Sequence, residues 1–221
     1  PVRTCFYPDA KDEALAVVKE ILAWRDAGYP LSDIAVLYRT SLEPRLLVER
    51  LMEYNVPFKT RDSLPNIYEH WISRNILAYI RAAMGDLDRG NVLEFINRPK
   101  RYISRDALET SPVSWERVKS FYQDREWMEE RIEQLEFDLA AIARLKPAAA
   151  VDYIRKAGGY NDYLKEYASF RRMKEEELLE VADQLQESAA GYSTFQAWFT
   201  HMEEYGRELA EQARRQTEPM K

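Results

Sequence analysis

The sequence predicts a mainly α-helical protein with a small α/β part at its N-terminal end. Three observations point to this fold class. Hydrophobic residues make up 46% of the chain and charged residues 32%, with only seven glycines, which is typical of a folded helical protein rather than a disordered or β-rich one. Short strand-like apolar runs occur only within residues 1–64. From about residue 65 onward, apolar residues recur at helical spacing instead.

The predicted α/β part alternates strands and helices. Residues 2–7, 34–38 and 55–58 have the apolar, β-branched or aromatic composition of strands, and residues 9–27 and 42–54 have the periodicity of amphipathic helices. This order is that of the beginning of a parallel sheet, but three strands are too few for a complete doubly wound domain. We therefore expect residues 1–64 to form an incomplete α/β segment.

The predicted helical domain covers residues 65–221, a normal domain size. Residues 72–84 carry one apolar face, and Met128, Ile132, Leu135, Leu139 and Ile142 alternate spacings of four and three, as in a seam between packed helices. Ser111, followed by Pro112, and Ser193, with Gln196 three residues later, have the pattern of helix starts.

Composition also limits the class of protein. The net charge of −6 argues against a strong free-standing nucleic-acid binder, so any such contact must be local. Cys5 is the single cysteine, which excludes an internal disulfide framework and favours a cytoplasmic setting. The sequence has neither a membrane-spanning apolar run nor a secretory leader. It begins at Pro1 without a methionine, which is compatible with processing or an excised fragment.

The sequence lacks the motifs of the common catalytic and metal sites. It contains no G-x-x-x-x-G-K-[ST] phosphate-binding loop, so we expect no nucleotide hydrolysis by this chain alone and no catalytic residues in it. His70 and His201 are the only histidines, and neither has a second ligand at metal-binding spacing. We expect no metal site.

Two polar segments are candidate binding sites. Arg39 and Ser41 follow the predicted strand 34–38, at the end where open α/β sheets place ligand contacts. Arg98, Lys100, Arg101 and Arg105 put four cations into eight residues of an otherwise acidic chain. These cations have two interpretations: they contact a phosphate backbone, or they form an exposed basic loop that pairs with acidic helices.

The order of several short segments resembles a known family. Residues 34–40, Arg45, residues 55–58, 76–81 and 96–101 follow one another as in the UvrD/PcrA/Rep family of superfamily 1 DNA helicases. Residues 157–160 and 176–180 are similar to two later segments of that family. The resemblance covers nearly the whole chain and is stronger in its first half.

This resemblance implies a specific architecture. In the family, the second motor domain, 2A, is a RecA-like α/β unit interrupted by a helical insertion called 2B. The chain resembles a partial RecA-like sheet edge of 2A, at residues 1–64, followed by a 2B-type domain at residues 65–221. The parent protein would be an ATP-dependent DNA helicase with 3′-to-5′ polarity, of the kind that serves DNA repair. Its ATP and Mg²⁺ would be bound by motor motifs outside this chain.

The resemblance also carries a set of nucleic-acid-binding positions. They are Arg39, Ser41, Arg98, Lys100, Arg101, Tyr102 and Ser104, and the charge cluster adds Arg105. For Arg39 a structural role within 2A is an equally good interpretation. They would meet DNA at a junction between single strand and duplex, and the helical domain would offer a surface to a regulatory protein.

Some of these positions depart from the family pattern. Ser41 stands where the family commonly has asparagine, and Tyr102 and Ser104 replace two glycines whose backbone N–H groups approach duplex phosphates. A Cβ at each position narrows the accessible backbone angles and hinders that approach. Glu94 replaces an expected arginine and makes the surroundings of the loop less cationic.

Two alternatives stay open at this point. The chain could be a helical protein-interaction adaptor, which would explain its acidic balance and its aromatic-rich last helix. It could also be the equivalent segment of a helicase–nuclease subunit, whose motor is built in the same way.

Overall fold

The computed structural model describes residues 2–39, 43–60 and 66–217. Contacts divide the chain into two units: the first unit comprises residues 1–66 and 202–221, and the second unit comprises residues 67–201. Every regular element among the described residues is a helix. The prediction of a mainly α-helical protein is therefore confirmed.

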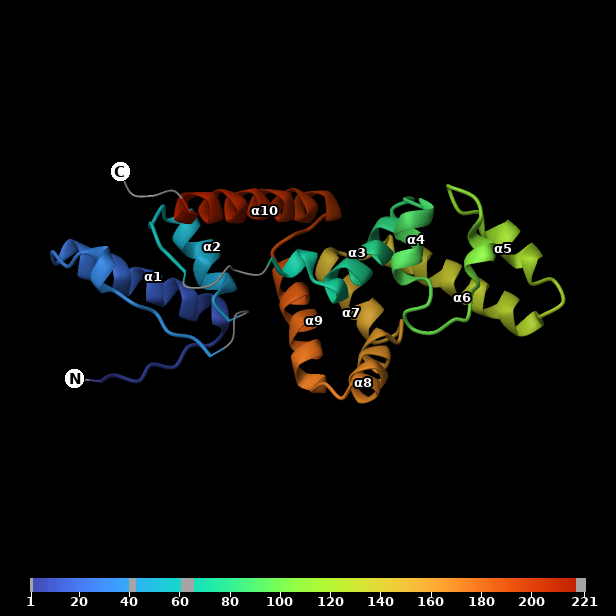
Figure 1. The fold of residues 1–221 in the computed structure, drawn as a ribbon, viewed down its shortest axis with the longest axis horizontal. Coiled ribbons are helices and arrows are strands. Elements are labelled where there is room, and N and C mark those ends of the chain that lie inside the picture. Colours follow the sequence, from blue (N-terminus) through green and yellow to red (C-terminus); the bar gives the residue numbers. More distant parts are fainter. Residues whose placement is uncertain (1, 40–42, 61–65, 218–221) are drawn as a thin grey trace. The chain divides into compact units, whose positions relative to one another are not determined.

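The first unit is built on two packed helices (Figure 1). These are α1 (Ala10–Asp26) and α2 (Arg45–Glu53), with the short 3-10 helix η1 (Leu31–Asp33) between them in the chain. Asp9 begins α1 as its N-cap, because its carboxylate accepts the backbone N–H of Asp12 at 2.8 Å. Their shared core contains Val18, Ile21, Leu51 and Val56.

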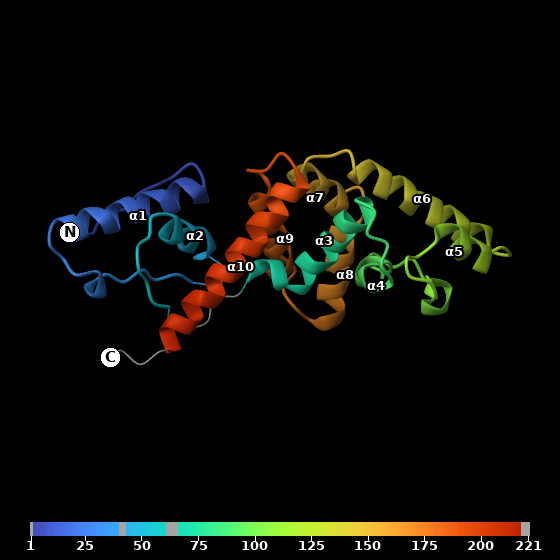
Figure 2. The same ribbon diagram turned by 90° about the horizontal axis from the view of Figure 1, so that it is seen from above.

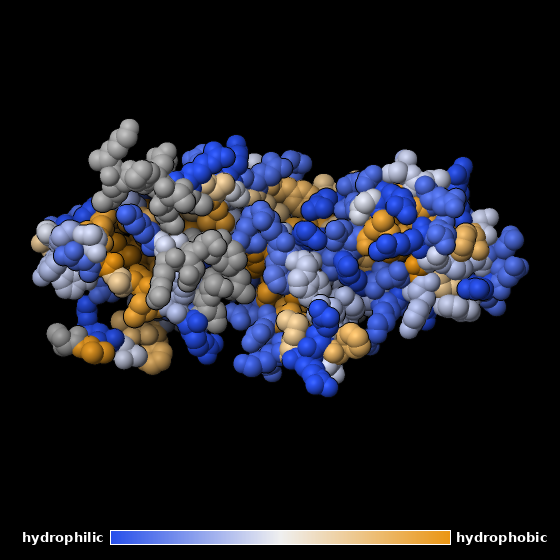
Figure 3. Space-filling view, viewed as in Figure 1, coloured by the Kyte–Doolittle hydropathy of each residue, from blue (hydrophilic) through white to orange (hydrophobic). Residues whose placement is uncertain are grey.

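The predicted strands at residues 2–7, 34–38 and 55–58 are not formed in the described residues. Ile34 has extended backbone angles, but a strand also needs a neighbouring strand that completes its ladder of hydrogen bonds. Phe6 and Leu37 are 92% and 93% exposed, so their apolar side chains have no sheet to cover them. Apolar surface is correspondingly visible over α1 and α2 in the space-filling view (Figure 3).

The second unit is a packed set of helices (Figures 1 and 2). In chain order they are η2 (Ile67–Glu69), α3 (Trp71–Ala83), α4 (Arg89–Phe95), η3 (Arg105–Leu108), α5 (Trp115–Phe121), α6 (Glu126–Ile142), α7 (Pro147–Arg155), α8 (Tyr160–Arg171) and α9 (Glu175–Ala189). The last helix, α10 (Phe195–Thr217), starts in this unit and continues into the residues of the first. Helix α3 is central because it packs against α4, α6, α7 and α9.

The helix predictions have mixed outcomes. The seam is confirmed, since Met128, Ile132, Leu135, Leu139 and Ile142 are all buried on α6. The predicted start at Ser111 is wrong: α5 is capped by Ser114, while the Ser111 hydroxyl donates to Asp88 Oδ1 at 2.8 Å. The start predicted at Ser193 is displaced by one residue, because the Thr194 hydroxyl accepts the backbone N–H of Ala197 at 3.3 Å.

Candidate nucleic-acid interface

The first candidate site lies at the end of the extended segment 34–38. The Arg39 side chain is 87% exposed, with its Nε 3.7 Å from Glu43 Oε1. The Arg39 backbone N–H donates to Glu43 Oε2 at 2.7 Å. Ser41, the other predicted residue of this site, lies outside the described residues. Arg39 therefore presents a largely solvent-facing cation at this end of the segment.

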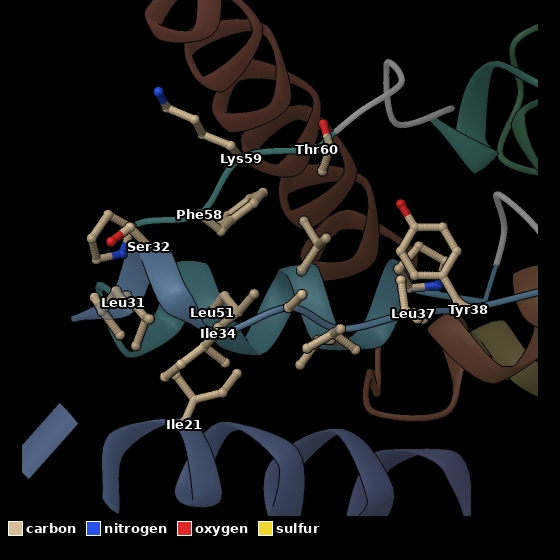
Figure 4. A pocket seen from close by; sticks show the side chains of 17 residues that line it. Ile21, Leu31, Ser32, Ile34, Leu37, Tyr38, Leu51, Phe58, Lys59 and Thr60 are labelled. Carbon is tan, nitrogen blue, oxygen red and sulfur yellow. The ribbon is translucent and has the colours of Figure 1, made fainter. Parts of the chain in front are cut away.

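Beside this segment the first unit has an apolar cavity of about 820 Å³ (Figure 4). Ile21 of α1 and Leu51 of α2 form its floor together with Ile34, while Leu37 and Phe58 lie along its sides. The cavity thus runs along the two segments, 34–38 and 55–58, that were expected to be strands.

The second candidate site is the basic loop, which we define as residues 97–105. It follows α4 and ends at Arg105, the first residue of η3. The Asn97 side chain joins the start of the loop to Ile103. Its Nδ2 donates to Ile103 O at 2.8 Å, and its Oδ1 accepts the Ile103 N–H at 3.0 Å. The Tyr79 hydroxyl of α3 donates to Arg98 O at 2.8 Å and fixes the loop to the core. The loop is therefore a built structure rather than a loose connection.

Arg101 lies inside this loop, although the sequence led us to expect a cation that faces solvent. The residue is 8% exposed, and its Nη1 donates to Ile96 O at 3.1 Å and to Pro99 O at 3.4 Å. Its guanidinium also lies 5.5 Å from the centre of the Tyr79 ring. Burial raises the pKa of Tyr79, and the Arg101 charge acts against that rise. In this structure Arg101 stabilises the loop from within.

Two other cations of the loop pair with carboxylates. Arg98 Nη1 lies 3.5 Å from Glu94 Oε2 and donates to Glu94 O at 2.6 Å. Lys100 Nζ lies 3.1 Å from Glu166 Oε2 of α8, and this contact raises the pKa of Lys100. The Lys100 and Glu166 side chains are 60% and 63% exposed, and such solvent-exposed pairs contribute little and exchange readily. Arg105 is exposed at the start of η3. Both interpretations of the basic loop therefore stay open.

The two residues that replace glycines differ in their backbone. Tyr102 has φ +60°, the left-handed region that favours glycine, and the residue is 66% exposed. Ser104 is extended, its N–H donates to the Tyr122 hydroxyl at 2.6 Å, and its own hydroxyl accepts the N–H of Asp106 at 3.2 Å. The N–H of Ser104 is thus already engaged within the protein.

Sequence reasoning missed a row of aromatic rings next to this loop. Trp71 at the start of α3 lies 4.9 Å, between ring centres, from Tyr167 of α8, and Tyr167 lies 6.2 Å from Tyr163. We call Trp71, Tyr163 and Tyr167 the aromatic row. The signal was present in the sequence as tyrosines at positions 160, 163 and 167, which share one helix face at this spacing.

The described residues form neither a membrane-spanning helix nor a cluster of metal ligands. None of the helices there is long and apolar enough to cross a membrane. In the same part of the chain, no group of three or more His, Cys, Asp or Glu side chains is arranged to hold a metal ion.

Comparison with known proteins identifies the family. The model of the UvrD-like helicase C-terminal domain matches residues 4–219 of the chain. The chain belongs to this family. The resemblance to UvrD-like helicases seen in the sequence is thereby confirmed.

Individual members of the UvrD-like helicases are also similar to this chain. The putative ATP-dependent DNA helicase YjcD of Bacillus subtilis is 26% identical over 178 residues, which cover 74% of this chain and 22% of that protein. The ATP-dependent DNA helicases PcrA of Staphylococcus epidermidis and Staphylococcus aureus are 34% and 31% identical over 99 residues, covering 45% of this chain and 13% of those proteins. The chain therefore corresponds to less than a quarter of the length of these relatives.

Proposed function

We propose that this chain is the DNA-binding and regulatory portion of an ATP-dependent 3′-to-5′ DNA helicase, with its second unit acting as a 2B-type domain. The observation that carries this proposal is the family match over residues 4–219. PcrA is named as an ATP-dependent DNA helicase and YjcD as a putative one, which supports DNA as the substrate of the parent protein.

The sequence and the described residues lack two usual features of an ATP–Mg²⁺ site. The sequence has no phosphate-binding loop, and the described residues hold no cluster of acidic side chains arranged for a cation. We therefore assign ATP binding and hydrolysis to other segments of the parent protein.

In this proposal the first unit is the edge of a RecA-like domain. Segments 34–38 and 55–58 would become strands when the remaining strands of the parent pair with them. The exposed Leu37 and the apolar cavity beside it support this view, because unpaired edge segments with apolar side chains normally find a cover.

DNA would meet the second unit at the basic loop. Lys100 and Arg105 are its most accessible cations, since Arg101 is buried and Arg98 is only partly exposed. A phosphate would replace Glu166 as the partner of Lys100, at small cost because the existing pair is exposed.

A binding measurement with matched charge reversals tests this proposal. The 221-residue chain is titrated into a fluorescein-labelled duplex with a 3′ single-stranded tail at low salt, and anisotropy is recorded. We expect the double variant Lys100→Glu/Arg105→Glu to lose most of the affinity. The control Arg144→Glu/Lys146→Glu reverses two exposed cations between α6 and α7 and should retain it. Wild-type chain that binds no DNA even at low salt would contradict the proposal and favour a protein-interaction adaptor.

A further inference from the structure

The aromatic row rests on a rigid support. Tyr160, at the start of α8, is buried, and its hydroxyl donates to Asn75 Oδ1 of α3 at 3.0 Å. Leu164 and Ala168 continue the buried face of α8. Tyr163 and Tyr167 are only half-buried at the margin of this face, where they border solvent. The row is thus fixed from behind and partly open in front.

Cations lie beside two rings of the row, the middle ring of Tyr167 and the end ring of Tyr163. The Arg171 guanidinium lies 6.0 Å from the centre of the Tyr167 ring. Arg98 and Lys100 of the basic loop lie near Tyr163: burial raises the pKa of this tyrosine, and both cations act against that rise. Positive charge therefore accompanies the rings along α8.

Acidic side chains in this region are engaged with cations. Glu166 pairs with Lys100, and Lys165 Nζ lies 3.7 Å from Asp162 Oδ1 on the same helix. Glu94 lies within ion-pair distance of both Arg74 and Arg98. The pairs that Glu94 and Asp162 form lower the negative potential that an approaching polyanion would meet.

Partly open aromatic rings between cations are the features with which proteins bind single-stranded nucleic acid. Unpaired bases stack on the rings while the cations contact the phosphates. A duplex offers only its phosphates to such a surface, because its bases are already stacked on one another. The chemistry of the row therefore favours a single strand over a duplex.

We propose that Trp71, Tyr163 and Tyr167 form a stacking site for unpaired DNA bases, continuous with the basic loop. This inference rests on the proposed function, since it adds a single-strand site to the DNA contact of the second unit. The row would hold the separated strand beside the point where the loop contacts phosphates.

Two oligonucleotides of equal length separate stacking from charge. One is a fluorescein-labelled oligothymidylate, and the other is a labelled abasic deoxyribose-phosphate chain, which has the phosphates without the bases. We expect wild-type chain to bind the oligothymidylate more tightly. Tyr167→Ala should weaken that binding by roughly tenfold, the order found when a ring that stacks on a base is removed, and leave abasic binding unchanged.

Matched variants control for structure. Phe170→Ala removes a ring of the same helix that is 83% exposed and outside the row, and it should bind like wild type. Tyr167→Phe keeps the ring and should also retain the affinity. Equal losses for both oligonucleotides in Tyr167→Ala, or a loss in Phe170→Ala as large as in Tyr167→Ala, would overturn the proposal.

Photocrosslinking of wild-type chain tests the site without any variant. Oligothymidylate that carries 5-iodouracil should crosslink to peptides that contain Trp71, Tyr163 or Tyr167, and crosslinks confined to other peptides would overturn the proposal. An acidic peptide that competes as well as oligothymidylate would reassign the row to a protein partner.

The two proposals can fail separately. Duplex binding that depends on Lys100 and Arg105, without any preference for oligothymidylate over the abasic chain, would remove the stacking site and leave the proposed function standing. No binding of any DNA at low salt would remove both.

Discussion

Asn97 and Ile103 exchange two hydrogen bonds, with the side-chain amide of Asn97 taking the place of a backbone partner. The amide N–H meets Ile103 O at 2.8 Å and the amide oxygen meets the Ile103 N–H at 3.0 Å. Because Ile103 is buried, its backbone groups have little access to water once Asn97 is removed. This pair fixes the width of the basic loop and so the positions of Lys100 and Tyr102 within it.

We predict that Asn97→Ala lowers the free energy of unfolding by about 1–3 kcal/mol, because it leaves buried backbone groups without partners. Urea denaturation followed by circular dichroism measures the change. Asn97→Asp keeps the acceptor and loses the donor, so its loss should also be measurable. An unchanged stability of Asn97→Ala would mean that Asn97 does not hold the loop.

Tyr102 provides a test of the backbone conformation. At φ +60° we expect Tyr102→Gly to be more stable than Tyr102→Ala by about 1 kcal/mol, since both variants lose the ring and only alanine has a Cβ in the left-handed region. At Phe137, which is exposed on helix α6, the order should be reversed by about 1 kcal/mol. The same order at both positions would contradict the left-handed conformation of Tyr102.

His70 predicts a pH dependence of stability. Its Nδ1 accepts the backbone N–H of Ile72 at 3.3 Å as the N-cap of α3, and burial lowers its pKa below the ordinary 6.5. Because the pKa of His70 is lowered in the folded chain, the unfolded chain binds the proton more readily. The stabilisation of the fold by the neutral His70 side chain is therefore present above pH 6.5 and is lost as the pH falls below it.

His70→Asn isolates this contribution, because asparagine is a good N-cap that does not titrate. The free energy of unfolding of wild type minus that of His70→Asn should decrease as the pH is lowered from about 8 to about 5. His201→Asn serves as the matched control. A difference that is constant over this range would contradict the assignment.

Tyr160 and Asn75 join α8 to α3 beneath the aromatic row. Tyr160→Phe should reduce the free energy of unfolding by about 1–3 kcal/mol, since the buried Asn75 Oδ1 loses its donor. Together with Asn75→Ala it forms a double-mutant cycle, in which the two losses should not add. Additive losses would show that the two side chains do not interact.

Helices whose buried residues recur at a regular spacing could be predicted from the sequence. The seam of α6 is an example, because Met128 to Ile142 repeat at spacings that only one packed face satisfies. Residues 34–38 and 55–58 have the local composition of strands but form none in the described part of the chain. Strand formation depends on neighbouring strands and not on local composition alone. The start of α5 was missed because Ser111 and Ser114 are equally good caps, and the bond from Ser111 to Asp88 is a tertiary contact.

The candidate site could be predicted only in part, because it too depends on tertiary contacts. Four cations in eight residues marked the basic loop, but their exposure depends on how the loop closes. Arg101 is buried because the loop turns the carbonyls of Ile96 and Pro99 toward it, and no local pattern signals that geometry. Trp71 joins the aromatic row from a helix 92 residues before Tyr163 in the chain, so the row could not be assembled from periodicity alone.

The salt dependence of duplex binding tests most directly whether the basic loop contacts phosphates. Each phosphate contact that is lost should lower the slope of log affinity against log salt concentration by about one. We predict that Lys100→Ala lowers the slope by about this amount and that Arg144→Ala leaves it unchanged. Identical slopes for wild type and Lys100→Ala would contradict the central claim that this loop is where the second unit meets DNA.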